Sequence, residues 1–283
     1  MKLPAFYVDD IIKNALKEDI NYIDVATDLL IDKNQITKGV MLAKADGVLC
    51  GLDIALRVFE LLSDKFEFKI FKNDGDALVK GDIIAEIKGP THFMLKGERT
   101  ALNLVQHLSG IATITNKCVK LIEGTNATIA DTRKTLPGLR ALQKYAVVCG
   151  GGKNHRFNLS DCAMLKDNHI DAAGGIFPAV KKLRETLGHT VKIEVETRNL
   201  FEVEQAIEAK ADIIMLDNMD NATMTEAVNI INGRAVSEAS GGITEETISS
   251  IAQTGVDIIS LGAITHSVKA FDISLKIRVG GEA

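Results

Sequence analysis

The sequence lacks several features that would have pointed to particular classes of protein. It has no excess of positive charge, since 33 Lys and Arg residues stand against 38 Asp and Glu residues for a net charge of −5, so we expect no nucleic-acid partner. It has no apolar run near the roughly 18 residues that span a bilayer, so we expect no membrane partner. Its first segment, "MKLPAFYVDD", reaches acidic residues before any hydrophobic stretch, which predicts that there is no secretory signal.

Cysteine and proline are also scarce, with four of each in 283 residues. Cys50, Cys118, Cys149 and Cys162 show neither CxxC pairing nor the spacing of zinc ligands. We expect buried thiols in a reducing compartment, and therefore a cytoplasmic protein. The few prolines and a charged fraction of 25% indicate an ordered chain. With 46% hydrophobic residues, the chain has enough material for one large domain or two moderate ones.

What the sequence does contain is a repeated strand motif. Six segments share one form, an apolar run that ends on a polar residue or glycine: "ATIADTRK", "CAMLKD", "VKIEVET", "ADIIMLDN", "AVSEASGG" and "VDIISLGA". Amphipathic stretches such as "NLFEVEQAIEAK" and "TEETISSIAQTG" lie between them with helical spacing. Alternating buried strands and helices predict an α/β fold with a parallel sheet. Six strands are fewer than the eight of a full barrel, so either two strands escape recognition or the barrel is incomplete.

The first hundred residues have a different pattern. "GVMLAKADGVLCGL" and "FEFKIFKNDGDALVKGDIIAEIKG" predict strands separated by turns, with a helix over "DIALRVFELLSD". We therefore expect a separate N-terminal domain over residues 1–110 and a barrel domain over residues 111–267, divided near the helical stretch from Gly97 to Glu123. The tail "FDISLKIRV" alternates like a strand, and residues 268–283 are expected to rejoin the first domain.

One N-terminal segment, "DGDALVKGDIIAEIKG", is superficially similar to a lipoyl or biotinyl hairpin. Such modules present a lysine at a tight turn between two halves, and this segment has no such turn. We therefore expect no covalent cofactor.

The residues that close the six strands are candidates for a site, because the active sites of parallel βα folds gather at the carboxyl ends of the strands. The alternative for any single member is a solvated turn or a helix cap. The strand-closing residues are Asp131 with Arg133 and Lys134, Lys166 with Asp167, Glu196, Asp217, Ser240 with Gly241, and Gly262.

The segment between the first and second strands contains "GGGKNHR", in which three glycines precede a cluster of cations. From Asp131 to His169 there are seven Lys or Arg residues and three acids, a local excess of four positive charges in an acidic chain. Such a reversal attracts anions, and glycine lets the backbone approach a ligand or adopt a positive φ. Arg140 and Lys144 have helical spacing and are expected on a solvated helix face. The cations assigned to a ligand are Arg133, Lys134, His155, Arg156 and Lys166.

Two later strand ends carry glycine, in "SGGI" and "LGAI". In barrels, the loops after the last strands commonly hold a phosphate. Glu196 and Asp217 are one βα unit apart and are expected to flank the same opening. Their carboxylates suit ribose hydroxyls, or a magnesium ion through water.

Taken together, these residues resemble the quinolinate phosphoribosyltransferase family, also called carboxylating nicotinate-nucleotide pyrophosphorylases. The most specific match is "DTRKTLPGLRALQKYAVVCGGGKNHRFNLSDCAMLKDNHI", followed by "IEVET", "IIMLDN", "EASGGI" and "ISLGAITHS", with "GERTALNLVQHLSGIAT" before it. The likeness runs from about Leu30 to Ser267. One departure is "NYIDVATDLL", where the family often has a Gly-Asp-x-Thr turn; it touches no candidate site residue.

The resemblance implies an open, incomplete α/β barrel beside an N-terminal α/β sandwich domain. It implies the conversion of quinolinate and phosphoribosyl pyrophosphate to nicotinate mononucleotide, pyrophosphate and carbon dioxide in de novo NAD biosynthesis, with Mg2+ as cofactor. It also implies a homodimer, with a higher oligomer left open, in which Arg99 of "GERT" reaches the site of the partner subunit.

The resemblance also implies roles for individual residues. Arg133, His155 and Arg156 would hold the quinolinate carboxylates, with Thr132, Lys134 and Lys166 nearby. Glu196 and Asp217 would hold ribose hydroxyls and magnesium, and with Lys134 and Lys166 they are the expected catalytic residues. The 5-phosphate would bind Ser240, Gly241, Gly242, Gly262 and Ala263.

Displacement at the anomeric carbon builds negative charge on the leaving pyrophosphate, which fixed cations stabilise. We therefore expect electrostatic lysines and no catalytic serine or cysteine. Three alternatives remain at this stage. They are a Schiff-base aldolase using Lys166, a paralogue of the same fold associated with molybdenum transport, and a non-enzymatic anion-binding scaffold.

Overall fold

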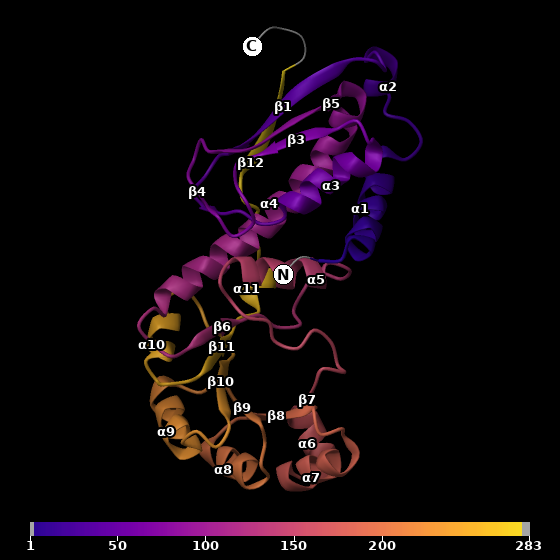
Figure 1. The fold of residues 1–283 in the computed structure, drawn as a ribbon. Helices are drawn as coiled ribbons and strands as arrows, with labels where there is room; N and C mark the ends of the chain where they lie inside the picture. Colours follow the sequence, from indigo (N-terminus) through magenta and orange to yellow (C-terminus); the bar gives the residue numbers. More distant parts are fainter. Residues whose placement is uncertain (1–2, 279–283) are drawn as a thin grey trace. The chain divides into compact units, whose positions relative to one another are not determined.

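The strands form three sheets, of four, six and two strands, in the computed structural model, which describes residues 3–278. The chain divides into two compact units. Unit 1 consists of residues 1–116, 136–151 and 265–283, and unit 2 consists of residues 117–135 and 152–264. Figure 1 labels most of the helices and strands of both.

Unit 1 contains a four-stranded antiparallel sheet with the order β12-β1-β5-β3. Alternation of side chains produces its core, because every second residue from Thr37 to Ala43 in β1 is buried while the residues between them are more exposed. Helix α3 buries an apolar face that includes Phe59, which is fully enclosed. The strand predicted in "FDISLKIRV" is β12, and it pairs with β1.

Most elements of unit 1 come from the N-terminal part of the chain, and α5 and β12 join them from later in the sequence. They are α1 (Ala5–Ile20), α2 (Thr27–Leu30), β1 (Ile36–Ala43), β2 (Gly47–Val48), α3 (Leu52–Leu62), β3 (Glu67–Ile70), β4 (Ala77–Leu78), β5 (Ile83–Pro90), α4 (Thr91–Leu121), which ends in unit 2, α5 (Arg140–Cys149) and β12 (Ile273–Arg278).

Unit 2 contains a six-stranded parallel sheet with the order β6-β11-β10-β9-β8-β7. All six predicted strands are present, so the prediction of an α/β fold with six parallel strands is confirmed. The two strands that begin the unit, β6 and β7, occupy opposite ends of the sheet and do not pair with each other within the described residues. The barrel is therefore open, which resolves the alternative of two unrecognised strands (Figure 1).

The elements of unit 2 alternate along the chain, except that no helix of this unit lies between β6 and β7 and that two helices follow β7. They are β6 (Thr128–Ala130), β7 (Cys162–Leu165), α6 (Asp167–Ala173), α7 (Ile176–Thr186), β8 (Lys192–Thr197), α8 (Leu200–Glu208), β9 (Ile213–Asp217), α9 (Asn221–Ile231), β10 (Val236–Ser240), α10 (Ile248–Ala252), β11 (Ile258–Ser260) and α11 (Ala263–His266), whose last residues belong to unit 1.

Two expectations about side-chain exposure are wrong. Lys144 does not lie on a solvated helix face but is fully buried, because α5 also buries the neighbouring Leu142, Gln143, Ala146 and Val147. Of the four cysteines, Cys50 and Cys118 are buried as expected, whereas Cys149 and Cys162 are only partly buried. Among the described residues, we find no helix that is both long enough and apolar enough to cross a bilayer.

Candidate active site

The polar ends of the parallel strands of unit 2 surround one pocket of about 500 Å³. Its wall brings together positively charged side chains, carboxylates and a glycine turn, from the strands and from the loops next to them. The lining residues are Thr132, Arg133, Lys134, His155, Arg156, Met164, Lys166, Glu196, Met215, Asp217, Asn218, Glu238, Ser240, Gly241, Gly242 and Ser260.

Asp131, which follows β6, binds the segment that carries His155 and Arg156. Lys153 forms an isolated parallel bridge with Ala130 at the end of β6. The fully buried Asp131 carboxylate then accepts hydrogen bonds from Asn154 Nδ2 at 2.6 Å and from the His155 backbone N–H at 2.9 Å. Because Asp131 fixes the backbone here, the side chains of His155 and Arg156 are held at the pocket.

The glycines of "GGGKNHR" allow the backbone to pack closely and to turn. Gly150 lies against α4, where an added Cβ would come within 2.4 Å of the Ala112 carbonyl oxygen. Gly151 has φ +91°, which disfavours other residues. The glycines therefore pack the end of α5 and turn the chain, and the cations that follow them supply the charge.

His155 rests on two glutamates from the interior of the barrel. Its Nε2 lies 3.2 Å from Glu194 Oε2 and 3.4 Å from Glu238 Oε1. Both carboxylates come from the middle of strands β8 and β10 and are 1% exposed or less. Two buried carboxyl groups beside one imidazole need at least one compensating proton among the three groups, because an unpaired buried charge is costly.

The environment of His155 favours its positive form. Burial lowers the pKa of His155, but hydrogen bonds and charge interactions with Glu194 and Glu238 outweigh burial and raise it to about 10. The Arg156 backbone N–H donates to Nδ1 at 2.8 Å and opposes a proton there. The two carboxylates lie at Nε2, which therefore carries the hydrogen that faces them. Burial also raises the pKa of Glu194.

The remaining cations are oriented by their own loops. The Arg156 guanidinium donates to the Cys162 carbonyl oxygen at 2.9 Å and lies 3.4 Å from Met164 Sδ, which directs it along β7. The Lys134 backbone N–H donates to Thr132 Oγ1 at 3.0 Å, which forms a tight turn after β6. These two cations come from different loops, yet both line the pocket.

Lys166 and Glu196 form an ion pair in the pocket, with 2.5 Å between Nζ and Oε2. The Lys166 side chain is about half exposed, whereas Glu196 is 14% exposed. The Lys166 ammonium therefore lies at the solvent-exposed side of the pocket, and the Glu196 carboxylate lies deeper in the pocket.

The turn after β10 approaches the neighbouring strand end closely. The Asn218 backbone N–H donates to the Ser240 carbonyl oxygen at 3.0 Å, and its side-chain amide donates to Asp217 at 2.9 Å. Gly241 has φ +96°, and an added Cβ would lie 2.3 Å from Asn218 Oδ1. Only glycine fits between these two strand ends, and its backbone is open to the pocket.

The structure brings together most of the predicted site residues. Thr132, Arg133, Lys134, His155, Arg156, Lys166, Glu196, Asp217, Ser240, Gly241 and Gly242 all line the pocket. Three predicted residues do not line it: Gly262 and Ala263 follow β11, and Arg99 is an exposed residue of α4 in unit 1.

Sequence reasoning missed the buried residues that hold the site in place. These are Asp131, which binds the backbone of the basic segment, and the pair Glu194 and Glu238, which contact His155. A signal for the glutamates was present, because residues two apart on a strand share a face. Glu194 precedes Glu196 by two in "IEVET", and Glu238 precedes Ser240 by two in "SEAS". Acids within an apolar strand, in phase with strand-end site residues, predict a polar interior layer beneath the site.

Comparisons with known proteins agree along the whole chain. Residues 24–109 match the family described as "Quinolinate phosphoribosyl transferase, N-terminal domain", and residues 111–276 match "Quinolinate phosphoribosyl transferase, C-terminal domain". A Bacillus subtilis protein named probable nicotinate-nucleotide pyrophosphorylase (carboxylating) is 45% identical over 266 residues, which cover 94% of this chain and 92% of that protein. A protein of the same name from Methanocaldococcus jannaschii is 45% identical over 280 residues, covering 96% and 97%. The crystal structure of NadC from Streptococcus pyogenes has a TM-score of 0.95 at 42% identity, covering 99% of this chain and all of that one.

Proposed function

The chain belongs to the quinolinate phosphoribosyltransferase family, and from its barrel pocket we propose how it carries out the family reaction. The reaction joins quinolinate to phosphoribosyl pyrophosphate and yields nicotinate mononucleotide, pyrophosphate and carbon dioxide, a step of de novo NAD biosynthesis. The observation that carries the proposal is one pocket that combines Arg133, Lys134, His155, Arg156 and Lys166 with the carboxylates of Glu196 and Asp217.

Quinolinate binds through its two carboxylates to Arg133, His155 and Arg156. Arginine forks a carboxylate with two parallel hydrogen bonds, and the positive charge that Glu194 and Glu238 favour on His155 attracts the anion. Both ring nitrogens of His155 already have partners, Nδ1 in the Arg156 N–H and Nε2 in the glutamates. The two arginines and this charge orient the pyridine ring, so that its nitrogen faces the anomeric carbon of the second substrate.

Phosphoribosyl pyrophosphate binds along the strand ends from β8 to β11. Glu196 and Asp217 accept hydrogen bonds from the ribose hydroxyls, and the turn of Ser240, Gly241 and Gly242 receives the 5-phosphate on backbone N–H groups, aided by Gly262 and Ala263. The positive φ at Gly241 and its lack of room for a Cβ support this role, because they expose backbone to the pocket.

The same carboxylates suit magnesium. Carboxylate oxygens are ligands that Mg2+ prefers, and Glu196 already stabilises a cation, the Lys166 ammonium. Glu196 and Asp217 would hold the ion, directly or through water. When bound, it supplies positive charge to the pyrophosphate oxygens. Calorimetry tests this fit, because Mg2+ should tighten phosphoribosyl pyrophosphate binding in the native chain and much less in Glu196→Gln.

Chemistry in this pocket needs charge placement and no protein nucleophile. The ring nitrogen forms a bond to the anomeric carbon while the bond to pyrophosphate breaks, and Lys134 and Lys166 stabilise the negative charge that the leaving group gains. The bond between the ring and the 2-carboxylate then breaks. Its electron pair stays on the ring carbon next to the cationic nitrogen, carbon dioxide leaves, and that carbon takes a proton. The Lys166–Glu196 ion pair supports an anion-binding lysine over a Schiff-base lysine, which must be uncharged to react.

We also propose that the enzyme works in the cytoplasm as a homodimer in which the partner subunit's Arg99 completes the pocket. Four free cysteines suit a reducing compartment. Arg99 is exposed on α4, where it is available to a second subunit.

Release of carbon dioxide from carboxyl-labelled quinolinate tests the proposed function. We expect label to be released only when phosphoribosyl pyrophosphate is present, in a one-to-one ratio with nicotinate mononucleotide. Release without the second substrate, or substrate binding without any product, would show that the pocket does different chemistry.

A further inference from the structure

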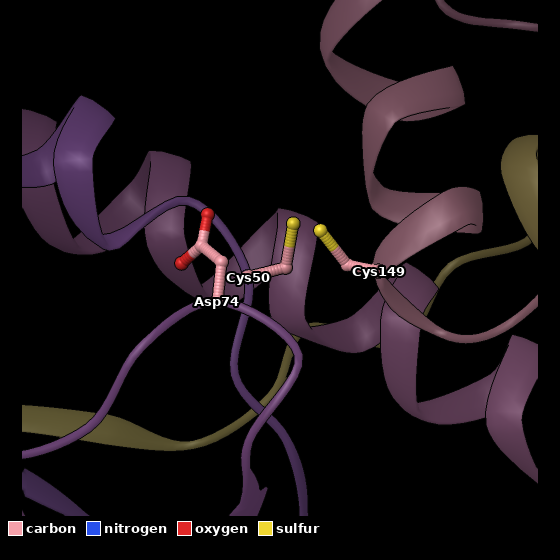
Figure 2. Close-up of side chains that lie close together, drawn as sticks. All are labelled: Cys50, Asp74 and Cys149. Atoms are coloured by element: carbon pink, nitrogen blue, oxygen red, sulfur yellow. The ribbon is translucent and has the colours of Figure 1, made fainter. Parts of the chain in front are cut away.

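A second cluster of reactive side chains lies in unit 1, outside the residues that line the barrel pocket. Ligand-type atoms of Cys50, Asp74 and Cys149 all lie within 4.8 Å of one another. Figure 2 shows the two sulfur atoms facing each other across a short gap, with the Asp74 carboxylate beside Cys50. Cys50 precedes α3 and Cys149 is the last residue of α5, so the fold joins two thiols that are far apart in the sequence.

Helix α4 fixes the backbone of both cysteines. Cys50 donates its N–H to Ser109 Oγ at 3.0 Å, and the same hydroxyl donates to the Cys50 carbonyl oxygen at 3.1 Å. On the other side, Gly150 packs so closely on Ala112 that it has no room for a Cβ. One helix therefore contacts the chain at both positions, and the two sulfur atoms lie within 4.8 Å of each other, so a disulfide requires them to approach to about 2.05 Å.

The two thiols have unequal acidity. A hydrogen bond from Cys50 lowers the pKa of Cys149 against the opposing effects of burial and the Asp74 charge, while burial raises the pKa of Cys50. By contrast, burial raises the pKa of Cys118 and of Cys162 to about 11. Cys149 is also partly exposed, whereas Cys50 is enclosed. One member is therefore suited to attack an oxidant and the other to resolve the product.

Asp74 has a separate task, which weighs against a metal site. Its Oδ1 accepts the Leu52 N–H at 2.9 Å, and its Oδ2 accepts the Gly51 N–H at 2.9 Å and the Tyr145 hydroxyl at 2.8 Å. The carboxylate thus caps the start of α3, and only two sulfur ligands remain. Asp74 and Tyr145 also line a cavity of about 420 Å³, whereas the two cysteines do not.

We propose that Cys50 and Cys149 form a reversible, peroxide-sensitive disulfide. Cys149 thiolate attacks a hydroperoxide oxygen and breaks the O–O bond, which gives a sulfenic acid and releases hydroxide or alkoxide. Cys50 sulfur then attacks Cys149 sulfur, and the sulfenic oxygen leaves as water with the Cys50 proton. Two thiols are oxidised and one peroxide is reduced. A cellular dithiol restores the reduced pair by exchange.

The disulfide would tie the start of α3 to the end of α5, next to the glycines that lead to His155 and Arg156. It would also protect Cys149 from irreversible oxidation. Such transient disulfides are the kind found in cytosolic proteins. The inference rests on unit 1 alone and does not depend on the reaction in the barrel.

Peptide mapping of the full chain tests the proposal. The protein is treated with hydrogen peroxide, its free thiols are alkylated, and it is digested without reduction and studied by mass spectrometry. We expect two of the four thiols to be lost, a linked peptide that joins Cys50 to Cys149, and full recovery with dithiothreitol. Four alkylated cysteines, a sulfinic Cys149 beside a free Cys50, or links only between chains would overturn it.

Variants separate the pair from general thiol oxidation. Cys149→Ser should leave Cys50 alkylated after peroxide, while the matched control Cys162→Ser, at another partly buried cysteine, should still form the linked peptide. If peroxide leaves both thiols intact while one equivalent of zinc blocks their alkylation, the cluster is a metal site and the proposal is wrong.

Discussion

At the scale of the residue, the chemistry of the pocket depends on acidic side chains that are buried beneath its cations. His155 faces the pocket, but Glu194 and Glu238 below it favour its charge, and Asp131 fixes its backbone. These three acids are almost fully buried. A positive pocket in an acidic chain is thus built on a layer of negative side chains.

Removal of a single arginine tests which anion it binds. Arg133→Ala should weaken quinolinate binding by roughly 2–5 kcal/mol, because the partner carboxylate loses its counter-charge in a closed site. Binding of phosphoribosyl pyrophosphate should change far less. Calorimetry with each ligand measures both, and Arg140→Ala, in the same basic segment but outside the pocket lining, is the control. Equal losses for the two ligands would show that Arg133 binds the phosphorylated substrate as well.

The imidazole of His155 predicts a pH dependence of stability. Its pKa is about 10 in the folded chain against an ordinary value of 6.5. A raised pKa means that the charged form stabilises the fold fully below the ordinary value, and that this contribution is lost as the pH rises through about 10.

Urea unfolding of the native chain and of His155→Gln measures this contribution. The difference in free energy of unfolding should be roughly 1–3 kcal/mol at about pH 6 and should shrink toward about pH 10.5. Two pH profiles that stay parallel over this range would mean that His155 is not charged in the folded protein.

At the scale of the element, the strands were predictable because burial on both faces leaves a continuous apolar run in the sequence. The six apolar runs that predict strands match β6 through β11. For most of these strands, the polar residue at the carboxyl end lines the pocket. The open form of the sheet was not decidable from the pattern, since an absent strand leaves no signal. Only the order of pairing shows that β6 and β7 end the sheet.

Helix periodicity was a weaker guide. Spacing alone put Arg140 and Lys144 on one solvated face, but it does not tell which face a helix buries, and α5 encloses Lys144. The cysteine pair was also beyond sequence reasoning, because Cys50 and Cys149 meet only through their common packing on α4. Both cases depend on contacts between elements, which the local pattern does not encode.

The turn after β10 gives a prediction at this scale. Gly241→Ala places a Cβ 2.3 Å from Asn218 Oδ1 at a residue with φ +96°. We expect strain of about 1–3 kcal/mol and an increase of roughly tenfold or more in KM for phosphoribosyl pyrophosphate. Gly188→Ala is the control, since an added Cβ there meets nothing within 4 Å. Steady-state kinetics with saturating quinolinate decide the matter, and an unchanged KM would remove this turn from the phosphate site.

At the scale of the whole molecule, the proposed dimer predicts complementation between inactive subunits. Arg99→Ala and Lys166→Ala should each be inactive alone. When they are co-expressed with different tags, half of the random dimers contain one site without either change, so activity should return to about a quarter of the native value. Co-expression of Lys166→Ala with Glu196→Ala is the control, because both residues line one pocket and no intact site can form. If the first mixture recovers no activity, Arg99 acts within its own subunit.

The pairing of the strands also constrains how the chain matures. β11 joins β6 to its sheet and β12 completes the edge of the other, and both follow all the other strands along the chain. During synthesis, β6 must therefore wait for β11, whereas β1 can pair with β5 early and waits only for β12 on its other side. Long-range pairing of this kind is slow, so nascent chains should depend on chaperones until β11 and β12 have been made, and a premature stop near residue 255 should leave neither sheet finished.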